Sequence, residues 1–288
     1  MQLFALTYPA FNPVLIEIGP LSIRWYALAY IFGILFVWWY ATRLVSNPRL
    51  WGPAGSPVTR KHLGDFVIWA TLGIILGGRI FYVFVYDFPK FREDPLSILQ
   101  LWEGGMSFHG AFLGVVLALL LFAWRHRLPL WSFVDVVAAG VPVTLFFGRI
   151  ANFINGELWG RVSDVPWAMA FPSAVSENLA AGLPADATRH PSQLYEAFLE
   201  GAVVFAILVI LIYRFKVLRR PGIVSGAFAT GYGTARIIGE FFREPDVQLG
   251  FISGGVTMGQ ILSVPMVIAG VALLVWSARR NRAAAAAE

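Results

Sequence analysis

The sequence contains no cysteine, which excludes disulfides, thiolate metal sites and a cysteine nucleophile within the chain itself. Its four histidines are scattered and never show the His-Glu-x-x-His spacing of zinc hydrolases, so we expect no metal. Neither Gly-x-Ser-Gly nor Gly-x-Ser-x-Gly occurs, and a serine nucleophile therefore lacks its usual signal. No basic segment precedes the first apolar block, so a cleaved signal peptide is not expected.

Charged residues are scarce and apolar residues abundant. They make up 14% and 58% of the chain, with a mean hydropathy of +0.67, whereas soluble domains average about 25% and about 45–50%. The apolar residues form long blocks, which favours a polytopic membrane protein over a large soluble core. The sequence thus predicts an all-α integral membrane protein, with residues 1–288 forming a single membrane domain.

Seven blocks are candidates for membrane-spanning helices, each of which needs about 20 mostly apolar residues. They cover residues 23–42, 64–86, 107–124, 131–150, 193–213, 222–242 and 256–278. The sixth block is the least regular, because it holds Arg236 and Glu240. Its glycines would allow close helix packing, and they are Gly226, Gly231, Gly233 and Gly239.

The basic residues predict the orientation of these spans, because Lys and Arg favour cytoplasmic loops. More than half of the 22 basic residues follow spans one, three, five and seven. They are Arg43, Arg49, Arg60, Lys61, Arg125, Arg127, Arg214, Lys216, Arg219, Arg220, Arg279, Arg280 and Arg282. Seven spans place all of them on one side, with the N-terminus outside, the C-terminus in the cytoplasm and 155–192 as a longer external loop region. The net charge of +5 then follows mostly from the orientation of the spans and does not indicate nucleic-acid binding, so we expect no nucleic-acid partner.

Polar residues follow directly on the apolar run 133–147, which only Asp135 interrupts. The segment 148–160 contains an arginine, two asparagines and a glutamate. Charges at the edge of hydrocarbon are costly and usually functional. This segment therefore predicts a site at the outer end of the fourth span.

Other spans bring polar residues to the same depth. Those spaced along one helical face are Tyr232, Arg236, Glu240 and Arg243; Gln193, Glu196 and Glu200; and Arg79, Tyr82 and Tyr86. His109 opens the third span, and Arg24 and Tyr26 open the first. Several arginines near a histidine predict an anion site with a titratable neighbour.

Structural alternatives stand beside this interpretation. Arg79 with Glu196 or Glu200 could form a structural ion pair, since unpaired charges in lipid are costly. A lone histidine at the start of a helix, such as His109, is often structural. Glu244 and Asp246 are expected to be solvated loop charges that tether Arg243.

Several motifs together resemble one family. They are Gly148-Arg149-x-x-Asn152-Phe153-x-Asn155-x-Glu157-x-x-Gly160, Ile23-Arg24-Trp25-Tyr26, Gly78-Arg79, Gly104-Gly105-Met106-Ser107-Phe108-His109-Gly110, His190-Pro191-Ser192-Gln193-Leu194-Tyr195-Glu196, and Tyr232-Gly233-x-x-Arg236 continuing to Glu240-Phe241-Phe242-Arg243-Glu244-Pro245-Asp246. In this order they are similar to the prolipoprotein diacylglyceryl transferases of bacterial inner membranes, over nearly the whole chain. One minor departure is Ala111, where that family usually has glycine.

The resemblance implies transfer of the diacylglyceryl group from phosphatidylglycerol to the lipobox cysteine thiol of a preprolipoprotein. A thioether forms and glycerol phosphate leaves. The implied partners are phosphatidylglycerol, the signal peptide with its lipobox cysteine and membrane lipids, and no cofactor is implied. The implied location is the inner membrane, with the site towards the periplasmic leaflet. A chain without cysteine fits this reaction, because the reactive sulfur belongs to the substrate.

Arg149 and Arg236 are assigned to the phosphate, because arginine binds phosphate through a planar, permanently charged fork. Donors that tighten on charge developing at the phosphate lower the barrier to C–O cleavage. The incoming thiol has a pKa of about 8.5 and must lose its proton. Two routes stay open: His109 acts as the base, or the arginines lower the thiol pKa enough without one.

The remaining expected site residues orient or bind the substrate. Tyr26, Asn152, Glu157 and Tyr232 would orient the headgroup or the arginines. Further substrate-binding residues are expected to be Arg79, Asn155, Gly160, Glu240 and Arg243.

Two other functions compete with a transferase. A transporter of an anionic solute or lipid would also place charges inside the membrane, but its path should continue through the cytoplasmic half. The inner halves of several spans, for example 203–211, are almost wholly apolar. A scaffold that binds lipid without chemistry is the other alternative.

Overall fold

The computed structural model describes residues 6–9, 11–19, 21–100, 104–245, 250–252 and 255–287, and helices dominate it. Within these residues, six helical segments are long and apolar enough to cross a membrane: Trp25–Val45, Arg60–Val85, Phe108–Arg125, Leu130–Asn155, Ser192–Phe215 and Met258–Arg280. The chain is therefore a multi-pass, all-α membrane protein. A further helix, α10 (Ile223–Gly239), lies over the sixth expected span but has only 17 residues. The seven-span arrangement and its orientation remain predictions.

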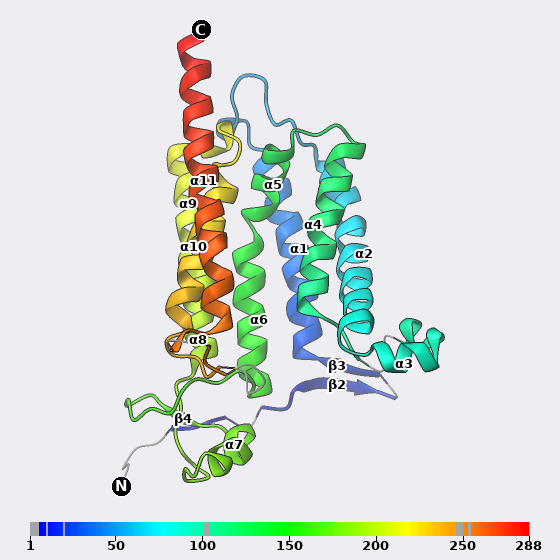
Figure 1. The fold of residues 1–288 in the computed structure, drawn as a ribbon. Helices are drawn as coiled ribbons and strands as arrows, with labels where there is room; N and C mark the ends of the chain where they lie inside the picture. Colours follow the sequence, from blue (N-terminus) through cyan, green and yellow to red (C-terminus); the bar gives the residue numbers. More distant parts are fainter. Residues whose placement is uncertain are drawn as a thin grey trace.

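The helices lie side by side, with the C-terminus at one end of the bundle (Figure 1). The long ones are α1 (Trp25–Val45), α2 (Arg60–Val85), α4 (Phe108–Arg125), α6 (Val141–Asn155), α9 (Val204–Phe215), α10 and α11 (Met258–Ala287). Shorter helical pieces are η1 (Pro48–Leu50), α3 (Phe88–Glu93), η2 (Pro95–Leu99), α5 (Leu130–Ala138), η4 (Pro172–Ala174), α7 (Val175–Ala180), α8 (Ser192–Glu196), η5 (Ala197–Val203) and η6 (Val217–Arg219).

Side chains at the helix ends explain several of these boundaries. Thr59 begins α2 with a capping box, in which its hydroxyl accepts from the His62 backbone N–H and the His62 ring accepts from the Thr59 N–H. Ser107 caps α4 by accepting from the Gly110 N–H. Helix α6 ends at Gly156, whose φ of 66° is the left-handed conformation that glycine adopts readily.

Two of the expected spans are not continuous α-helices. The fourth divides into α5 and α6 around Gly140, and Pro142 in the first turn of α6 lacks a backbone N–H donor. A Cβ on Gly140 would lie 3.0 Å from the Val37 backbone of α1, so this break also lets α1 approach closely. The fifth contains η5, a turn of π-helix between α8 and α9.

Glycines also allow α2 and α4 to pack backbone to backbone. A Cβ on Gly77 would lie 2.8 Å from the Gly114 Cα, and one on Gly73 would lie 2.6 Å from the Gly114 carbonyl oxygen. Gly110 faces Gly77 in the same contact. This spacing of small residues four apart is typical of close helix pairs in membranes.

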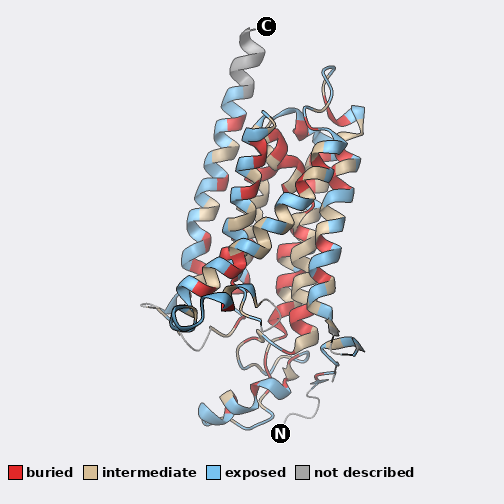
Figure 2. Ribbon diagram, turned by 90° about the vertical axis from the view of Figure 1, so that its right-hand side faces the viewer, coloured by how far each residue is buried: buried red, intermediate tan, exposed pale blue. Residues whose placement is uncertain are grey.

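The main apolar core lies between the helices towards the C-terminal end of the bundle. Its fully buried members include Leu44, Phe122, Phe133, Leu208 and Ile212. Figure 2 shows buried residues on the inner faces of the helices and exposed ones outside. Many of the exposed residues are large and apolar, which suits helices whose outer faces contact lipid.

A small cap covers the other end of the bundle, away from the C-terminus (Figure 1). There β1 (Leu6–Thr7) pairs in parallel with β4 (Met169–Ala170), with Leu6 opposite Met169. Strand β2 (Val14–Ile18) pairs antiparallel with β3 (Leu21–Arg24). The Tyr8 hydroxyl donates to the Phe153 and Ile154 carbonyls in the last turn of α6, at 2.6 and 2.8 Å. Burial raises the pKa of Tyr8, so it stays a donor and fixes the end of α6 from the cap.

Asp135 fixes the N-terminal end of α10, as Tyr8 fixes the C-terminal end of α6, by a hydrogen bond to backbone groups at the helix end. It is fully buried in α5 and accepts from the backbone N–H groups of Gly222 and Ser225, at 2.7 and 2.8 Å. The Ser225 hydroxyl also donates to it, at 2.5 Å. A carboxylate at a helix N-terminus satisfies free N–H groups and interacts favourably with the helix dipole. The residue that interrupts the apolar run 133–147 therefore holds α10 in place.

Candidate active site

Two arginines and two glutamates from different helices meet inside the bundle. Arg149 of α6 places Nη1 2.9 Å from Glu196 Oε2 and Nη2 3.1 Å from Glu200 Oε2. Arg236 of α10 places Nη1 2.7 Å from Glu196 Oε1 and 3.3 Å from Glu200 Oε1. Each carboxylate therefore lies between two guanidiniums.

Glu240 and Arg243 extend this group into a network of three arginines and three glutamates. Arg236 Nη2 pairs with Glu240 Oε1, and the Thr257 hydroxyl donates to Glu240 Oε2 at 2.7 Å. Arg243 Nη1 lies 3.7 Å from Glu196 Oε1. The expected helical stripe is not continuous, because α10 ends at Gly239 and Arg243 lies beyond it. Its three charged residues nevertheless join one network, in which the formal charges balance. We call these six residues the Arg–Glu cluster.

Burial gives the cluster an inner and an outer side. The side chains of Glu196 and Glu200 are 0% exposed, whereas those of Arg149 and Arg236 are 15% and 13% exposed. The glutamates therefore stand behind the arginines and hold their guanidiniums in place. The spacing Gln193, Glu196, Glu200 was the sequence signal for this support, but it predicted only a polar face and not the partners.

The π-helical turn η5 contributes to this arrangement. Glu200 lies within η5, next to Gly201, whose added Cβ would lie 2.5 Å from Phe146 Cβ of α6. The absence of a side chain at Gly201 lets η5 approach α6, which carries Arg149. Short π-helical turns occur frequently at functional sites.

The loop after α6 is fixed by hydrogen bonds from α6 and α8. Asn152 and Asn155 donate to Glu157 Oε1, at 2.8 and 3.2 Å. Gln193 donates to the Glu157 carbonyl at 2.7 Å. Leu158, which follows, adopts a φ of 59° that is uncommon outside glycine. Asn152, Asn155 and Glu157 thus form one polar group beside Arg149.

Gly160 and Arg161 lock this loop onto the end of α10. The Gly160 N–H donates to the His190 carbonyl at 2.8 Å, and an added Cβ would collide with Phe242 and His190. Arg161 donates to the carbonyls of Glu240 and Arg243, both at 3.0 Å. Gly160 is therefore required for close packing. Arg161 was missed from the sequence, although it directly follows the polar segment.

A profile of the family described as prolipoprotein diacylglyceryl transferase matches residues 13–276. The chain belongs to this family. A phosphatidylglycerol–prolipoprotein diacylglyceryl transferase of Brucella canis is 54% identical over 282 residues, which cover 98% of this chain and 96% of the relative. The enzyme of the same name from Bradyrhizobium diazoefficiens is 54% identical over 283 residues, with the same coverage.

The two tyrosines and the histidine expected at the site differ in their contacts. Tyr232 stacks on Phe228 along α10 and interacts electrostatically with Arg149 and Arg236. Tyr26, at the start of α1, lies 3.4 Å from the Tyr30 hydroxyl. His109 is exposed in the first turn of α4. Among the described residues, no polar contact joins its imidazole to the cluster, so the base role stays a prediction.

Another histidine, His190, contacts a tyrosine beside the loop. The Tyr195 hydroxyl accepts from the Trp167 indole N–H at 2.6 Å and lies 3.1 Å from His190 Nδ1. Burial lowers the pKa of His190, which favours the neutral ring.

Two charged residues have partners that differ from those expected. Glu244 pairs with Arg189 at 3.0 Å, while Asp246 lies outside the described residues, so the expected tether to Arg243 stays a prediction. Arg79 does not pair with Glu196 or Glu200. It is buried, and its guanidinium donates to the carbonyls of Ser97, Ile98, Gly104 and Gly105. Helical spacing predicted which face of its helix carries Arg79, but its partners lie in η2 and in the loop before His109.

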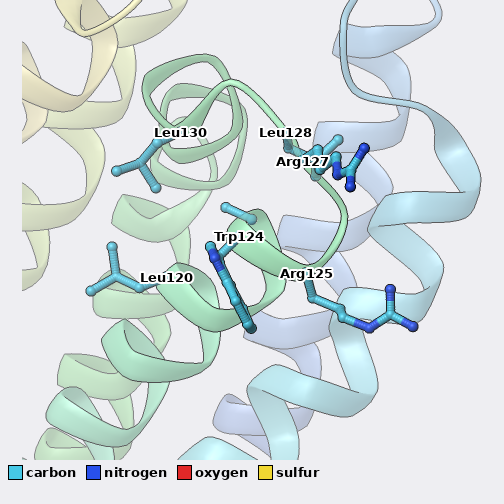
Figure 3. A pocket seen from close by; sticks show the side chains of 7 residues that line it. Leu120, Trp124, Arg125, Arg127, Leu128 and Leu130 are labelled. Atoms are coloured by element: carbon cyan, nitrogen blue, oxygen red, sulfur yellow. The ribbon is translucent and has the colours of Figure 1, made fainter.

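One hollow on the surface lies away from the cluster. It has a volume of 740 Å³ and lies where α4 turns into α5, lined by Leu120, Ala123, Trp124, Arg125, Arg127, Leu128 and Leu130. In Figure 3, Arg125 and Arg127 point away from Leu120 and Leu130, so the arginines do not converge on a ligand. Neither a carboxylate nor a histidine lines it. The candidate active site is the Arg–Glu cluster at the other end of the bundle.

Arg79→Lys tests the loop-holding role of Arg79. Lysine keeps the charge but cannot match the planar fork that reaches four carbonyls. We expect the free energy of unfolding to fall by roughly 1–3 kcal/mol, as for lost hydrogen bonds to a charged group. Thermal unfolding of the purified protein measures this, with exposed Arg92→Lys in α3 as the matched control. Equal unfolding temperatures for the two variants would show that the carbonyl contacts contribute nothing.

Proposed function

We propose that this protein transfers the diacylglyceryl group of phosphatidylglycerol to the lipobox cysteine of preprolipoproteins. Its family and the names of its relatives support the reaction. The observation that carries the proposal is the pair of partly exposed guanidiniums, Arg149 and Arg236, held side by side by buried glutamates. A fixed pair of planar forks suits the phosphodiester of a lipid headgroup.

The reaction replaces one bond at the carbon of the diacylglyceryl group that carries the phosphate ester. The thiol sulfur bonds to this carbon while the C–O bond breaks, and the electron pair of that bond stays on the phosphate oxygen. The thiol proton passes to a base, a thioether forms and glycerol phosphate leaves. Because the phosphate gains negative charge as the bond breaks, Arg149 and Arg236 stabilise the transition state more than the bound lipid.

The remaining residues have supporting roles in this proposal. His109 accepts the thiol proton, because its imidazole is exposed in the first turn of α4 and imidazole is the commonest general base in enzymes. Asn152, Asn155 and Glu157 shape the headgroup site beside Arg149, and Tyr26 and Tyr232 border it. Glu240 and Arg243 support Arg236, while Gly160 and Arg79 act through the loops that they hold.

The proposed location is the bacterial inner membrane, with the cluster towards the periplasmic leaflet. Helices α6 and α10, whose C-terminal halves carry Arg149 and Arg236, end at the capped end of the bundle, whereas α1, α4 and α9 end at the opposite side (Figure 1). Their last turns carry Arg43, Arg125 and Arg214. An excess of basic residues favours the cytoplasmic side. This supports an N-terminus in the periplasm and a C-terminus in the cytoplasm.

A transfer assay tests the function and the phosphate role together. Purified protein is incubated with phosphatidylglycerol labelled in its acyl chains and a lipobox peptide, and we expect the label on the cysteine. Arg149→Lys keeps the charge but loses the bidentate fork, so kcat/KM should fall about 10- to 100-fold. Solute flux without peptide labelling would indicate a transporter, and lipid binding with neither would indicate a scaffold.

The matched control is Arg214→Lys in the last turn of α9. Arg214 is exposed at the other end of the bundle, so its replacement should leave transfer near the wild-type rate. Full activity of Arg149→Lys, with normal folding, would contradict the assignment of Arg149 to the phosphate.

His109→Gln tests the base. Glutamine cannot take up the thiol proton, so transfer should be slow at neutral pH and should recover partly as rising pH ionises the thiol itself, with its pKa of about 8.5. The measurement is the pH profile of kcat/KM from pH 6 to 9. A wild-type rate across this range would mean that the arginines alone activate the thiol.

A further inference from the structure

The Arg–Glu cluster is electrically balanced before any lipid binds. It contains the arginines 149, 236 and 243 and the glutamates 196, 200 and 240. A phosphodiester adds one negative charge to this balanced group. Glu196 and Glu200 are fully buried, where excess charge is poorly solvated. Binding the lipid anion without a compensating positive charge is therefore unfavourable.

The carboxylates of Glu196 and Glu200 depend on the same two guanidiniums. Arg149 contacts Oε2 of both glutamates, and Arg236 Nη1 contacts Oε1 of both. A phosphate that takes donors from these arginines weakens the pairing of both carboxylates at once. Two carboxylates that share one site cannot easily both stay ionised, and one of them then takes a proton.

We propose that phosphatidylglycerol binding is coupled to the uptake of one proton, and that Glu200 takes it. This rests on the proposed function, since the same arginines hold the phosphate. Glu196 has three arginine partners, Arg149, Arg236 and Arg243, whereas Glu200 has the first two alone among the described ion pairs. Glu240 keeps a donor in Thr257 besides Arg236. The ionised form of Glu200 is thus the one that loses the most stabilisation when Arg149 and Arg236 bind the phosphate.

The charged groups that face Glu200 come from α6, from α10 and from its own helical segment. Helix α6 presents Arg149, and α10 presents Tyr232 and Arg236, with Glu240 beyond them. Its own helical segment presents Glu196. In the described part of the chain, no histidine is among these charged neighbours. The carboxylates are therefore the groups in the cluster that can accept a proton near neutral pH.

Proton uptake at Glu200 also favours the transfer step. A neutral Glu200 attracts Arg149 less strongly than a carboxylate does. The guanidinium of Arg149 can then tighten on the second negative charge that the phosphate gains as the C–O bond breaks. Glu200 is a positioning residue in this account, because it acts through Arg149 and not on the lipid.

Calorimetry in several buffers measures the proton directly. Short-chain phosphatidylglycerol is titrated into the purified full-length protein at pH 7, in buffers of different ionisation enthalpy. The dependence of the binding heat on that enthalpy gives the protons exchanged. We expect uptake of about one proton by the wild type, almost none by Glu200→Gln, and wild-type uptake by Glu200→Asp, which keeps a carboxyl group.

Two controls are needed. One tests whether the net charge of the lipid, and not its phosphate alone, drives proton uptake, and the other tests whether Glu200, and not His109, accepts the proton. Phosphatidylcholine has the same phosphodiester but a neutral headgroup overall, so its binding should exchange far fewer protons. His109→Gln should still take up the proton when phosphatidylglycerol binds. Loss of uptake in that variant would assign the proton to the imidazole and overturn the proposal.

The remaining outcomes are also decisive. Binding of phosphatidylglycerol without proton exchange in the wild type overturns the proposal, as does undiminished uptake in Glu200→Gln. If transfer to the lipobox peptide proceeds in the same preparation, only the proton coupling has failed. If folded wild-type protein does not bind phosphatidylglycerol at all, the proposed function fails with it.

Discussion

Four buried ion pairs between Arg149, Arg236, Glu196 and Glu200 hold three helical segments together inside an apolar bundle. Removing one partner of a buried pair typically costs about 3–5 kcal/mol, because the remaining charge stays buried and unpaired. The cluster therefore fixes the spacing of α6, η5 and α10. The same constraint keeps two guanidiniums side by side and partly exposed, ready for an anion.

Other contacts hold the helices that bring these charges together. Tyr8 closes the end of α6, Arg161 binds the carbonyls that end α10, and Asp135 caps the beginning of α10. Each uses one polar side chain to satisfy free backbone groups at a helix end. The cap that carries Tyr8 thus supports the site mechanically, although its strands are short. Precise placement matters because transition-state stabilisation depends on donors that do not need to reorganise.

The helices themselves follow closely from the sequence, because blocks of about 20 apolar residues have few alternatives in a membrane. The pairing of Arg236 with Glu240 was also predictable, since residues four apart share a helix face, whereas Arg243 lies beyond the end of α10. Partners were not predictable from spacing. Arg79 and Arg149 are both arginines near helix ends, yet one binds loop carbonyls and the other binds glutamates. The π-helical turn η5 packs against Phe146 of α6, and no local pattern predicted it, whereas Gly140 and Pro142 are a local signal for the break between α5 and α6.

A structure of the protein with bound phosphatidylglycerol tests most directly whether Arg149 and Arg236 together hold the phosphate of a phospholipid. We predict the phosphate within hydrogen-bonding distance of both guanidiniums, with Glu196 still paired behind them. A lipid phosphate bound elsewhere, with all four ion pairs of the cluster unchanged, would contradict it.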